Sequence, residues 1–188
     1  RVAICDKDAE RVQVFATDHE NIFASVGNVS NETDVIDFFS GVEAKLGGLD
    51  ALINNAGIAG PMSNLEKFNF ADWQETISVN LNGAFLCSKE AIPMLRTAGG
   101  GSIINIGSTS SFFGTPLRSA YSATKWALIG LTKTWAMEYG HENIRVNAIC
   151  PGSVNGPRIE RVIKKEADER DTDPSIVKEA YLNQTSMQ

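Results

Sequence analysis

The alternation of two kinds of segment constrains the fold of this chain more than any other feature. Five apolar, β-rich runs predict strands, at residues 1–5, 21–27, 49–55, 101–108 and 144–150. Four stretches with three- and four-residue apolar spacing predict helices between them, at residues 8–18, 31–46, 71–96 and 119–139. Because the strand runs are continuously apolar, we expect them to be buried on both faces of a parallel sheet. The pattern predicts an α/β fold, a doubly wound parallel sheet with helices on both faces.

Composition and charge exclude several classes of protein. The 188 residues suffice for one domain with its own core. The net charge of −6 argues against binding to nucleic acid or to a membrane surface, because both require a basic face. Three cysteines form no Cys-x-x-Cys pair and two histidines lack ligand-like spacing; these are Cys5, Cys87, Cys150, His19 and His141. We therefore expect reduced thiols, a cytoplasmic protein and no metal site.

The end of the chain departs from the alternation. Residues 158–173 are densely charged and carry only a thin apolar stripe of Ile159, Val162 and Ile163. This stretch is interpreted either as a solvated surface helix or as a flap beside a ligand cleft. Asp173 and Pro174 predict the start of a last helix that runs to about Leu182. Residues 153–182 are thus expected to form a substrate-side flap and helix.

Polar residues and glycines follow the predicted strands, where open α/β sheets bind their ligands. Asp6 follows the first strand. An acidic residue at the end of the second strand of a dinucleotide-binding fold accepts hydrogen bonds from the adenosine ribose and repels a 2′-phosphate. Asp6 would therefore favour NAD over NADP, although Lys7 would offset the repulsion in part. The alternative interpretation is that Asp6 caps the helix at 8–18.

Glycine and asparagine residues surround two other turns. In "NNAG", at 54–57, we expect Asn54 to tie adjacent strands together, and the loop is either a plain turn or a close approach to a nucleotide. The glycines at 99–101 precede a strand instead of following one. They are interpreted as a flexible turn and not as a phosphate loop.

A tyrosine and a lysine lie four residues apart on the predicted helix at 119–139. Tyr121 and Lys125 would share one helix face, and an ammonium near a phenol favours the phenolate. Such a tyrosine can exchange a proton with an oxygen in a cleft. The alternative is an interface tyrosine beside a lysine whose stem covers apolar surface. Ser108 follows a strand and could hold the same oxygen, while Asn80, inside a helix, could bend it and hold a water.

These motifs together resemble the classical short-chain dehydrogenase/reductase family. The matching stretches are "NNAG" at 54–57, "VNLNG" at 79–83, "INIGS" at 104–108, "YSATK" at 121–125 and "NAICPG" at 147–152. They occur in the family's order and spacing over nearly the whole chain. The resemblance implies a single Rossmann-type NAD(P)-binding domain over 1–188. It also implies the interconversion of a secondary alcohol and a ketone by hydride transfer.

The resemblance also implies roles for individual residues. Tyr121 would be the acid/base, Lys125 its partner and a ligand of the nicotinamide ribose, Ser108 the residue that orients the substrate, and Asn80 the holder of a relay water. The adenosine side would be lined by Asp6, Asn28, Val29, Asn55, Ala56 and Gly57. The nicotinamide side would be lined by Pro151, Gly152 and Val154.

The chain also departs from the family pattern. The first strand with its glycine-rich turn and the last strand are missing, so a chain truncated at both ends is expected. Asn28 replaces a frequent aspartate beside the adenine, and Gly156 replaces a threonine that often contacts the nicotinamide carboxamide.

Substrate and partners are less sharply constrained. The substrate pocket is expected to be formed by residues 60–68, residues 109–114 and the flap, with Phe112 and Phe113 as apolar surface. The substrate is expected to be a small polyol, sugar or hydroxy-acid-like alcohol. Helices 71–96 and 119–139 predict a homotetramer or homodimer, the alternative being cover by missing terminal segments. A catalytically inactive remnant without a pyrophosphate site, or a nucleotide-sugar epimerase of the extended type, remains an alternative function.

Overall fold

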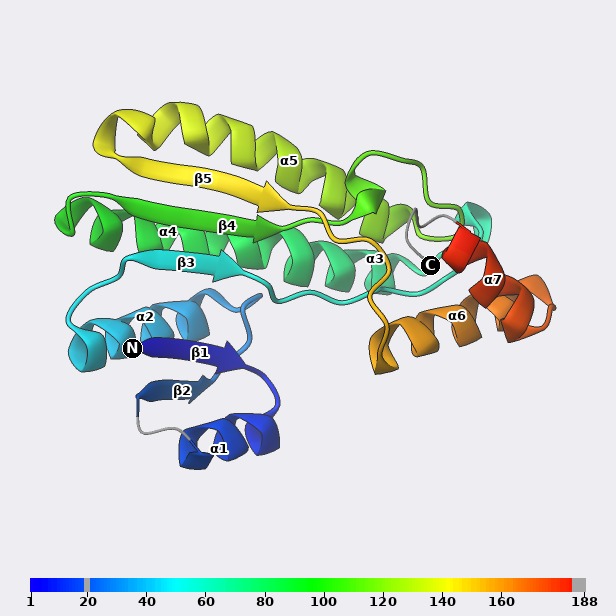
Figure 1. The fold of residues 1–188 in the computed structure, drawn as a ribbon, viewed down its shortest axis with the longest axis horizontal. Helices are drawn as coiled ribbons and strands as arrows, with labels where there is room; N and C mark the ends of the chain where they lie inside the picture. The colour runs from blue at the N-terminus through cyan, green and yellow to red at the C-terminus, as the bar shows by residue number, and fades with distance from the viewer. Residues whose placement is uncertain (19–20, 184–188) are drawn as a thin grey trace.

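Five parallel strands form the centre of the molecule. The computed structural model describes residues 1–18 and 21–183. Strand β1 (Val2–Asp6) pairs with β2 (Ile22–Val26), while a second sheet has the order β3 (Ala51–Asn54), β4 (Gly101–Ile106) and β5 (Ile144–Ile149). β1 and β3 run side by side in the same direction, without a strand ladder between them in the described part of the chain (Figure 1). The carboxyl ends of all five strands therefore lie on one edge of the fold.

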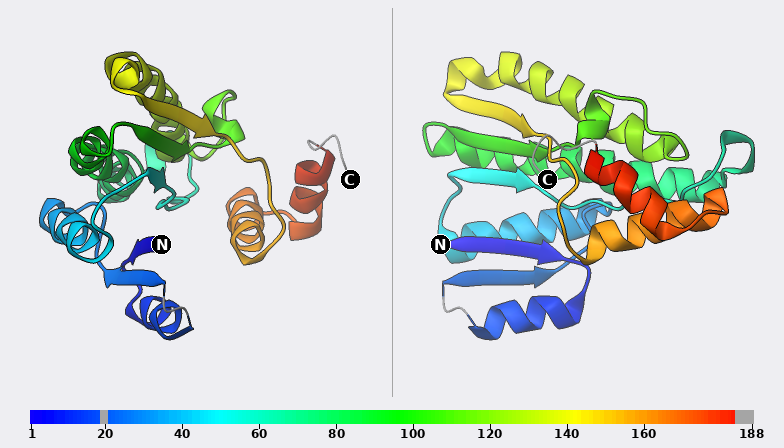
Figure 2. Two further views of the ribbon diagram at one scale, coloured as in Figure 1. Left: turned by 60° about the vertical axis from the view of Figure 1, so that its left-hand side comes forward. Right: turned by 45° about the vertical axis from the view of Figure 1, so that its right-hand side comes forward.

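Helices follow the strands in the predicted alternation. They are α1 (Ala9–Asp18), α2 (Glu32–Leu46), α3 (Phe70–Ile77), α4 (Gly83–Thr97), α5 (Ser119–Tyr139), α6 (Pro157–Arg170) and α7 (Pro174–Asn183). Short 3₁₀ turns lie at Leu65–Lys67, Thr109–Ser111 and Gly140–Glu142. α1 packs against β1 and β2 at the opposite end of the fold from α5 (Figure 2). The fold is thus the predicted α/β class.

Local sequence explains where several elements begin and end. Asn31 caps α2 by accepting a hydrogen bond from the backbone of Asp34, and Gly47 ends that helix in the left-handed region. Asp173 accepts a hydrogen bond from the backbone of Ser175, so α7 begins at Pro174 as its sequence predicts. α6 begins at Pro157, a residue suited to the first helical position.

The predicted helix at 71–96 contains an irregular turn. α3 and α4 are joined by a π-helical segment, Ser78–Asn82, and Asn80 lies in its middle. π-helical turns insert an extra residue into a helix and often occur at functional sites. The local irregularity expected at Asn80 is therefore present, in the form of a π turn.

The prediction that every strand is buried on both faces is wrong. Ile103 in the central strand β4 is fully buried, but Val2, Val26 and Ile53 are 53%, 55% and 59% exposed. The reason is the separation of the two sheets. The exposed residues lie on β1, β2 and β3, each of which is at the edge of its sheet, whereas β4 has a paired strand on both sides among the described residues.

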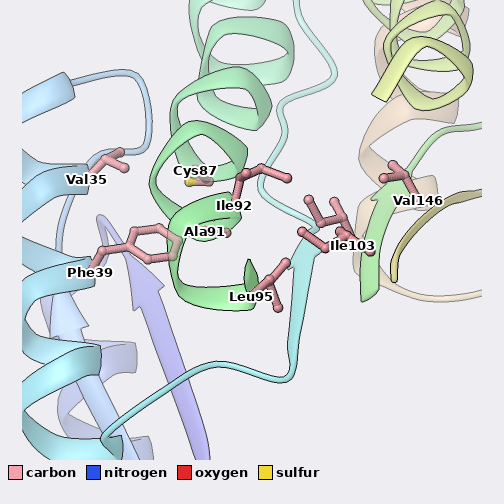
Figure 3. Packing of buried hydrophobic residues seen from close by; sticks show 9 residues of the cluster. Val35, Phe39, Cys87, Ala91, Ile92, Leu95, Ile103 and Val146 are labelled. Atoms are coloured by element: carbon pink, nitrogen blue, oxygen red, sulfur yellow. The ribbon is translucent and has the colours of Figure 1, made fainter. Parts of the chain in front are cut away.

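One apolar cluster packs α2 and α4 against each other and against the second sheet (Figure 3). Its buried members come from α2, α4, β4 and β5, and are Val35, Phe39, Cys87, Ala91, Ile92, Leu95, Ile103, Ile144 and Val146. Burying each of its larger side chains contributes about 1.5–3 kcal/mol. Since α2 and α4 meet here, this cluster fixes the first sheet relative to the second.

The charged segment near the end of the chain forms a helical pair. α6 and α7 lie beyond the carboxyl ends of the strands (Figure 1). They pack through Ile163, Ala167 and Val177, with Ile159 and Tyr181 beside them. Two residues of the predicted apolar stripe, Ile159 and Ile163, therefore face α7, Val162 is also buried, and most charged residues of α6 are exposed.

Candidate functional site

Helix α5 carries Tyr121 and Lys125 to the carboxyl edge of the sheet. Tyr121 is 8% exposed and Lys125 is 5% exposed, and the Lys125 Nζ lies 5.6 Å from the centre of the Tyr121 ring. Nζ donates a hydrogen bond of 2.6 Å to the carbonyl oxygen of Ile106, the last residue of β4. This bond fixes the ammonium group of Lys125 at the end of β4. Tyr121 lies one turn earlier on the same helix.

The charge of Lys125 is held in an unfavourable setting. Burial, the largest cause, and the positive charges of Arg158 and Arg118 together lower the pKa of Lys125 to about 8, while Cys150 opposes them. A group poised near neutral pH suits proton transfer better than an ordinary lysine. Arg158 lies in the first turn of α6, so the helical pair also contributes to this electrostatic field.

Ser108 is joined to α5 through a neighbouring hydroxyl. Its Oγ accepts a hydrogen bond from the backbone N–H of Ser110, and its own backbone N–H donates to Ser111 Oγ, each at 3.2 Å. Ser111 Oγ then donates to the carbonyl oxygen of Lys125 at 2.8 Å. The turn that contains Ser108 is therefore fixed against the helical turn that presents the lysine.

Asn80 holds the loop that follows β3. Its Oδ1 accepts a hydrogen bond from the N–H of Ile58 at 2.8 Å, and its Nδ2 donates to the carbonyl oxygen of Ile58 at 3.0 Å. Nδ2 also approaches Thr124 Oγ1 at 3.3 Å. A methyl group at Gly57 would lie 3.2 Å from Asn80 Oδ1, so this glycine lets the loop close on the π turn.

The adenosine-side candidates lie at the ends of β1 and β2. Asp6 is exposed, and its Oδ1 accepts a hydrogen bond from the N–H of Asp8. Asp8 Oδ1, in turn, accepts from the N–H of Arg11 in the first turn of α1, so Asp8 takes the capping role considered for Asp6. Asn28 Oδ1 accepts from the backbone and hydroxyl of Ser30.

A surface hollow of ≈ 270 Å³ lies beside these residues. It is lined by Lys7, Ser25, Val26, Gly27, Asn28, Asp34 and Asp37. Val29 is half-buried and lies against Gly83 of α4, where an added methyl group would meet its side chain at 2.8 Å. A second hollow of ≈ 290 Å³ lies between α2 and α4, among residues that include Phe39 and Met94, away from the strand ends.

The remaining candidates lie on the loops after β3 and β5. Asn55 and Ala56 are exposed beyond β3. Pro151 accepts a hydrogen bond at its carbonyl oxygen from the N–H of Thr109, which ties the loop after β5 to the turn after Ser108. Gly152 lies beside Thr109, and Val154 is 70% exposed. The structure thus brings the loops after β4 and β5 together.

A hydrogen-bond network of side chains joins β3 and β4 to the helices α4 and α5. Asn54 Nδ2 donates to Asn105 Oδ1 on β4 and to Ser88 Oγ on α4, at 2.8 and 3.0 Å. Asn105 Nδ2 donates to Thr132 Oγ1 on α5 at 2.9 Å. Asn54 therefore ties β3 to β4, as its sequence predicts, and the network extends to both flanking helices.

Arg118, Ser111 and Ile106 have roles that sequence reasoning missed. The Arg118 guanidinium lies 3.9 Å above the centre of the Tyr121 ring, and the side chain is 8% exposed. Its place directly before the predicted helix at 119–139, with Tyr121 in the first turn, is the only sign of this proximity in the sequence. The hydrogen bonds of Lys125 to Ser111 and to the Ile106 carbonyl are tertiary contacts, which leave no signal in the sequence.

Some expectations concern absences or residues outside this region. No helix within residues 1–18 and 21–183 is long and apolar enough to cross a membrane. The described residues contain no group of three or more His, Cys, Asp or Glu side chains arranged to hold a metal ion. His141 is exposed, while His19 lies outside the described residues. Cys5, Cys87 and Cys150 are free.

Parallel strands that end in a common polar edge, with helices on both sides, define a Rossmann-type α/β domain. The family profile described as "short chain dehydrogenase" matches residues 1–167. The chain belongs to the short-chain dehydrogenase family.

Individual relatives agree with that assignment. The chain is 43% identical to a trans-4-hydroxycyclohexanecarboxylate dehydrogenase of Sinomonas cyclohexanicum, covering 78% of this chain and 51% of the relative. It is 34% identical to levodione reductase of Leifsonia aquatica, over 77% and 54%. The crystal structure of an NAD⁺-bound xylitol dehydrogenase superposes with a TM-score of 0.91 at 29% identity, covering 98% and 75%. The chain thus spans about half the length of the curated relatives it matches.

Proposed function

We propose that the protein is an NAD-preferring oxidoreductase that interconverts a secondary alcohol and a ketone. The observation that carries this proposal is the placement of Tyr121 and Lys125 together on α5, at the strand edge where Ser108 is also fixed. The relatives named above are a dehydrogenase acting on a hydroxy compound and a reductase, which supports the same reaction class.

Each side chain then has a distinct task. Tyr121 gives a proton to, or takes one from, the substrate oxygen, and the Ser108 hydroxyl donates a hydrogen bond that orients this oxygen. Lys125 supplies positive charge beside the phenol. Asn80 holds the loop at Ile58 and, through the π turn, keeps α3 and α4 in register with that loop. A bound nicotinamide supplies the hydride acceptor or donor.

The residues present fit an NAD cofactor on both of its nucleoside sides. Asp6 keeps its Oδ2 oxygen without a partner among the described residues, at the exposed end of β1, where a ribose would be bound. Asn28 and Gly27 line the adjacent hollow, and Val29 follows them on the chain. Asn55, Ala56 and Gly57, on the loop after β3, would complete the adenosine side. Lys125 with Pro151, Gly152 and Val154 would hold the nicotinamide side. The xylitol dehydrogenase structure contains NAD⁺, which supports this choice of cofactor.

The reaction is tested with the full chain and a panel of secondary alcohols. With NAD⁺ present, we expect at least one alcohol to be oxidised, as followed by the absorbance of the reduced nicotinamide. Saturable NAD⁺ binding with no turnover of any alcohol or ketone would instead support the alternative of an inactive binding scaffold.

Asp6→Ala tests the choice between NAD and NADP. Removing the carboxylate removes both its ribose hydrogen bonds and its repulsion of a 2′-phosphate. We expect the ratio of kcat/KM for NAD to that for NADP to fall by about tenfold or more. A tenfold change corresponds to the free energy of one charge-assisted hydrogen bond. Asp8→Ala removes the neighbouring cap and serves as the control, with an unchanged ratio. An unchanged ratio in Asp6→Ala would exclude Asp6 as the selecting residue.

The assembly and the location of the protein are also proposals. Phe85 on α4 and Trp126 on α5 are 50% and 52% exposed, and large apolar side chains in such positions favour a partner surface. We place a second copy of the chain against these two helices, in a homodimer or homotetramer. The three free thiols support a cytoplasmic location.

A further inference from the structure

Arg118 is a buried charge without a counter-ion. The side chain is 8% exposed, and no Asp or Glu carboxylate of the described residues lies within ion-pair distance of it. Its Nε is buried and has no hydrogen-bond partner in the described part of the chain, and Nη2 makes only a long contact of 3.5 Å with the carbonyl oxygen of Ala59. Burying an unpaired charge is costly, so such groups normally have a partner.

Two features of the backbone around Arg118 are energetically unfavourable, the conformation of Leu117 and the position of Arg118 at a helix N-terminus. Leu117 has φ of +64°, a conformation uncommon for a bulky residue, and its carbonyl oxygen accepts a hydrogen bond from the N–H of Ser63. Arg118 itself occupies the N-cap position of α5, where its side chain caps nothing. A cation at a helix N-terminus opposes the helix dipole, whereas an anion is stabilised there. Strain that persists beside reactive groups is often linked to function.

The guanidinium has a defined relation to the reacting groups. It lies 3.9 Å above the centre of the Tyr121 ring, and its charge reaches Lys125 on the same helix. It also acts on Tyr181 of α7: burial and the hydrogen bond to Glu166 raise the Tyr181 pKa to about 12, against the opposing charge of Arg118. Arg118 therefore lies against the phenol ring, and its charge reaches both Lys125 and Tyr181 of α7.

We propose that Arg118 binds a carboxylate of the substrate, so that the alcohol oxidised at Tyr121 belongs to a short hydroxy acid. This inference rests on the proposed function and names its substrate class. A guanidinium presents paired N–H groups whose geometry matches a carboxylate. A substrate whose hydroxyl meets the phenol would carry its carboxylate, a few bonds away, to the guanidinium above the ring. The anion would provide the missing counter-ion and meet the N-terminus of α5 with the favourable sign.

The proposal is tested by binding, without turnover. The probes are 3-hydroxybutyrate and 1,3-butanediol, which share a carbon skeleton and a secondary hydroxyl but differ in the carboxylate. Their dissociation constants are measured by calorimetry on the full chain saturated with NADH, in which an alcohol cannot be oxidised. We expect 3-hydroxybutyrate to bind about 10- to 100-fold more tightly than the diol, as a charge-assisted pair predicts. Equal affinities would overturn the proposal.

Three variants complete the test. Arg118→Met should lower the affinity for 3-hydroxybutyrate to that for the diol, while Arg118→Lys retains part of the difference and covers the case in which the Met variant fails to fold. Arg145, an exposed arginine near the start of β5, lies far from the carboxyl ends of the strands, so Arg145→Gln removes the same charge and should change neither affinity. An unchanged affinity ratio in Arg118→Met and Arg118→Lys would overturn the proposal.

The anion bound by Arg118 could belong to the substrate, as a carboxylate, or to the cofactor, as a phosphate, and NADH affinity distinguishes these two. If Arg118 binds the substrate, the dissociation constant of NADH stays within about twofold in Arg118→Met, well below the cost of a lost charge-assisted bond. A tenfold loss of NADH affinity with an unchanged probe ratio would show that the guanidinium recognises a cofactor phosphate, which contradicts the proposal. An enzyme that binds the probes as expected but oxidises no alcohol would refute the proposed function alone.

Discussion

Lys125 is the residue whose charge depends most clearly on the fold. Burial first, then the charges of Arg158 and Arg118, lower its pKa from 10.5 to about 8. In the unfolded chain the lysine keeps its ordinary value, so between about pH 8 and pH 10.5 the unfolded chain holds a proton that the native protein has lost. The unfolding free energy must therefore rise with pH across this window, because the unfolded state binds more protons there.

This sign gives a prediction for Lys125→Met. The free energy of unfolding of the wild type, minus that of the variant, should be constant below about pH 8 and increase toward pH 10.5. Urea denaturation at several pH values measures the difference. Lys133→Met, at an exposed position of the same helix, provides the comparison and should show no such increase. A flat difference for Lys125→Met would contradict the burial of its charge.

Single residues also show what the sequence could and could not predict about the site. Tyr121, Lys125 and Ser108 were found because their spacing places them on one helix and at one strand end. For Asp6 the sequence allows two roles, a ribose ligand or a helix cap, and only the structure shows that Asp8 is the residue that caps α1. Arg118 was missed because an arginine before a helix resembles any surface cation. Its burial depends on a contact with Ala59, which is distant in the sequence, and on packing over the Tyr121 ring, which the sequence does not reveal.

Among the elements, the turn from α4 into β4 contains two glycines in the left-handed region, Gly99 and Gly100, whose surroundings differ. Gly100 has φ of +134°, and a methyl group there would lie 2.7 Å from the carbonyl oxygen of Asn143. Gly99 has φ of +84° but has nothing within 4 Å of an added methyl group. The run that was expected to be a merely flexible turn is thus a tight contact between the starts of β4 and β5.

The two glycines should therefore differ in their response to alanine. Gly99→Ala pays only for the left-handed conformation, about 1–2 kcal/mol. Gly100→Ala adds a backbone clash, and we expect a loss of about 3–5 kcal/mol in the free energy of unfolding. Denaturant unfolding of both variants measures the two values. Similar losses would mean that the Asn143 contact is not rigid.

Periodicity predicted the elements better than their interruptions. Strand and helix boundaries agree closely because apolar spacing and caps such as Asn31 and Asp173 are local signals. The π turn at Ser78–Asn82 was expected only as a bend, because its register depends on Asn80 meeting Ile58 of another loop. Strand burial was wrong at Ile53, since pairing along a strand edge cannot be read from the strand itself.

At the scale of the whole molecule, α4 and α5 present Phe85 and Trp126 to solvent. If a second copy covers them, replacing both by glutamate places charges in an apolar interface. We expect light scattering to show a smaller assembly for Phe85→Glu/Trp126→Glu than for the wild type. Met137→Glu, at an exposed position on the same helix, tests whether any charge on α5 has this effect. An unchanged mass for the double variant would exclude these residues from the interface.

Oxidation rates of the full chain and its Tyr121→Phe variant test the central claim most directly. The variant keeps the ring beneath Arg118 and removes only the hydroxyl that exchanges the proton. We expect the rate of NAD⁺-dependent alcohol oxidation to fall by about 100-fold or more, the scale of general acid–base catalysis, with little change in NAD⁺ affinity. Tyr139→Phe, the same substitution near the end of α5, should keep the wild-type rate. Equal rates for wild type and Tyr121→Phe would contradict the assignment of proton transfer to this phenol.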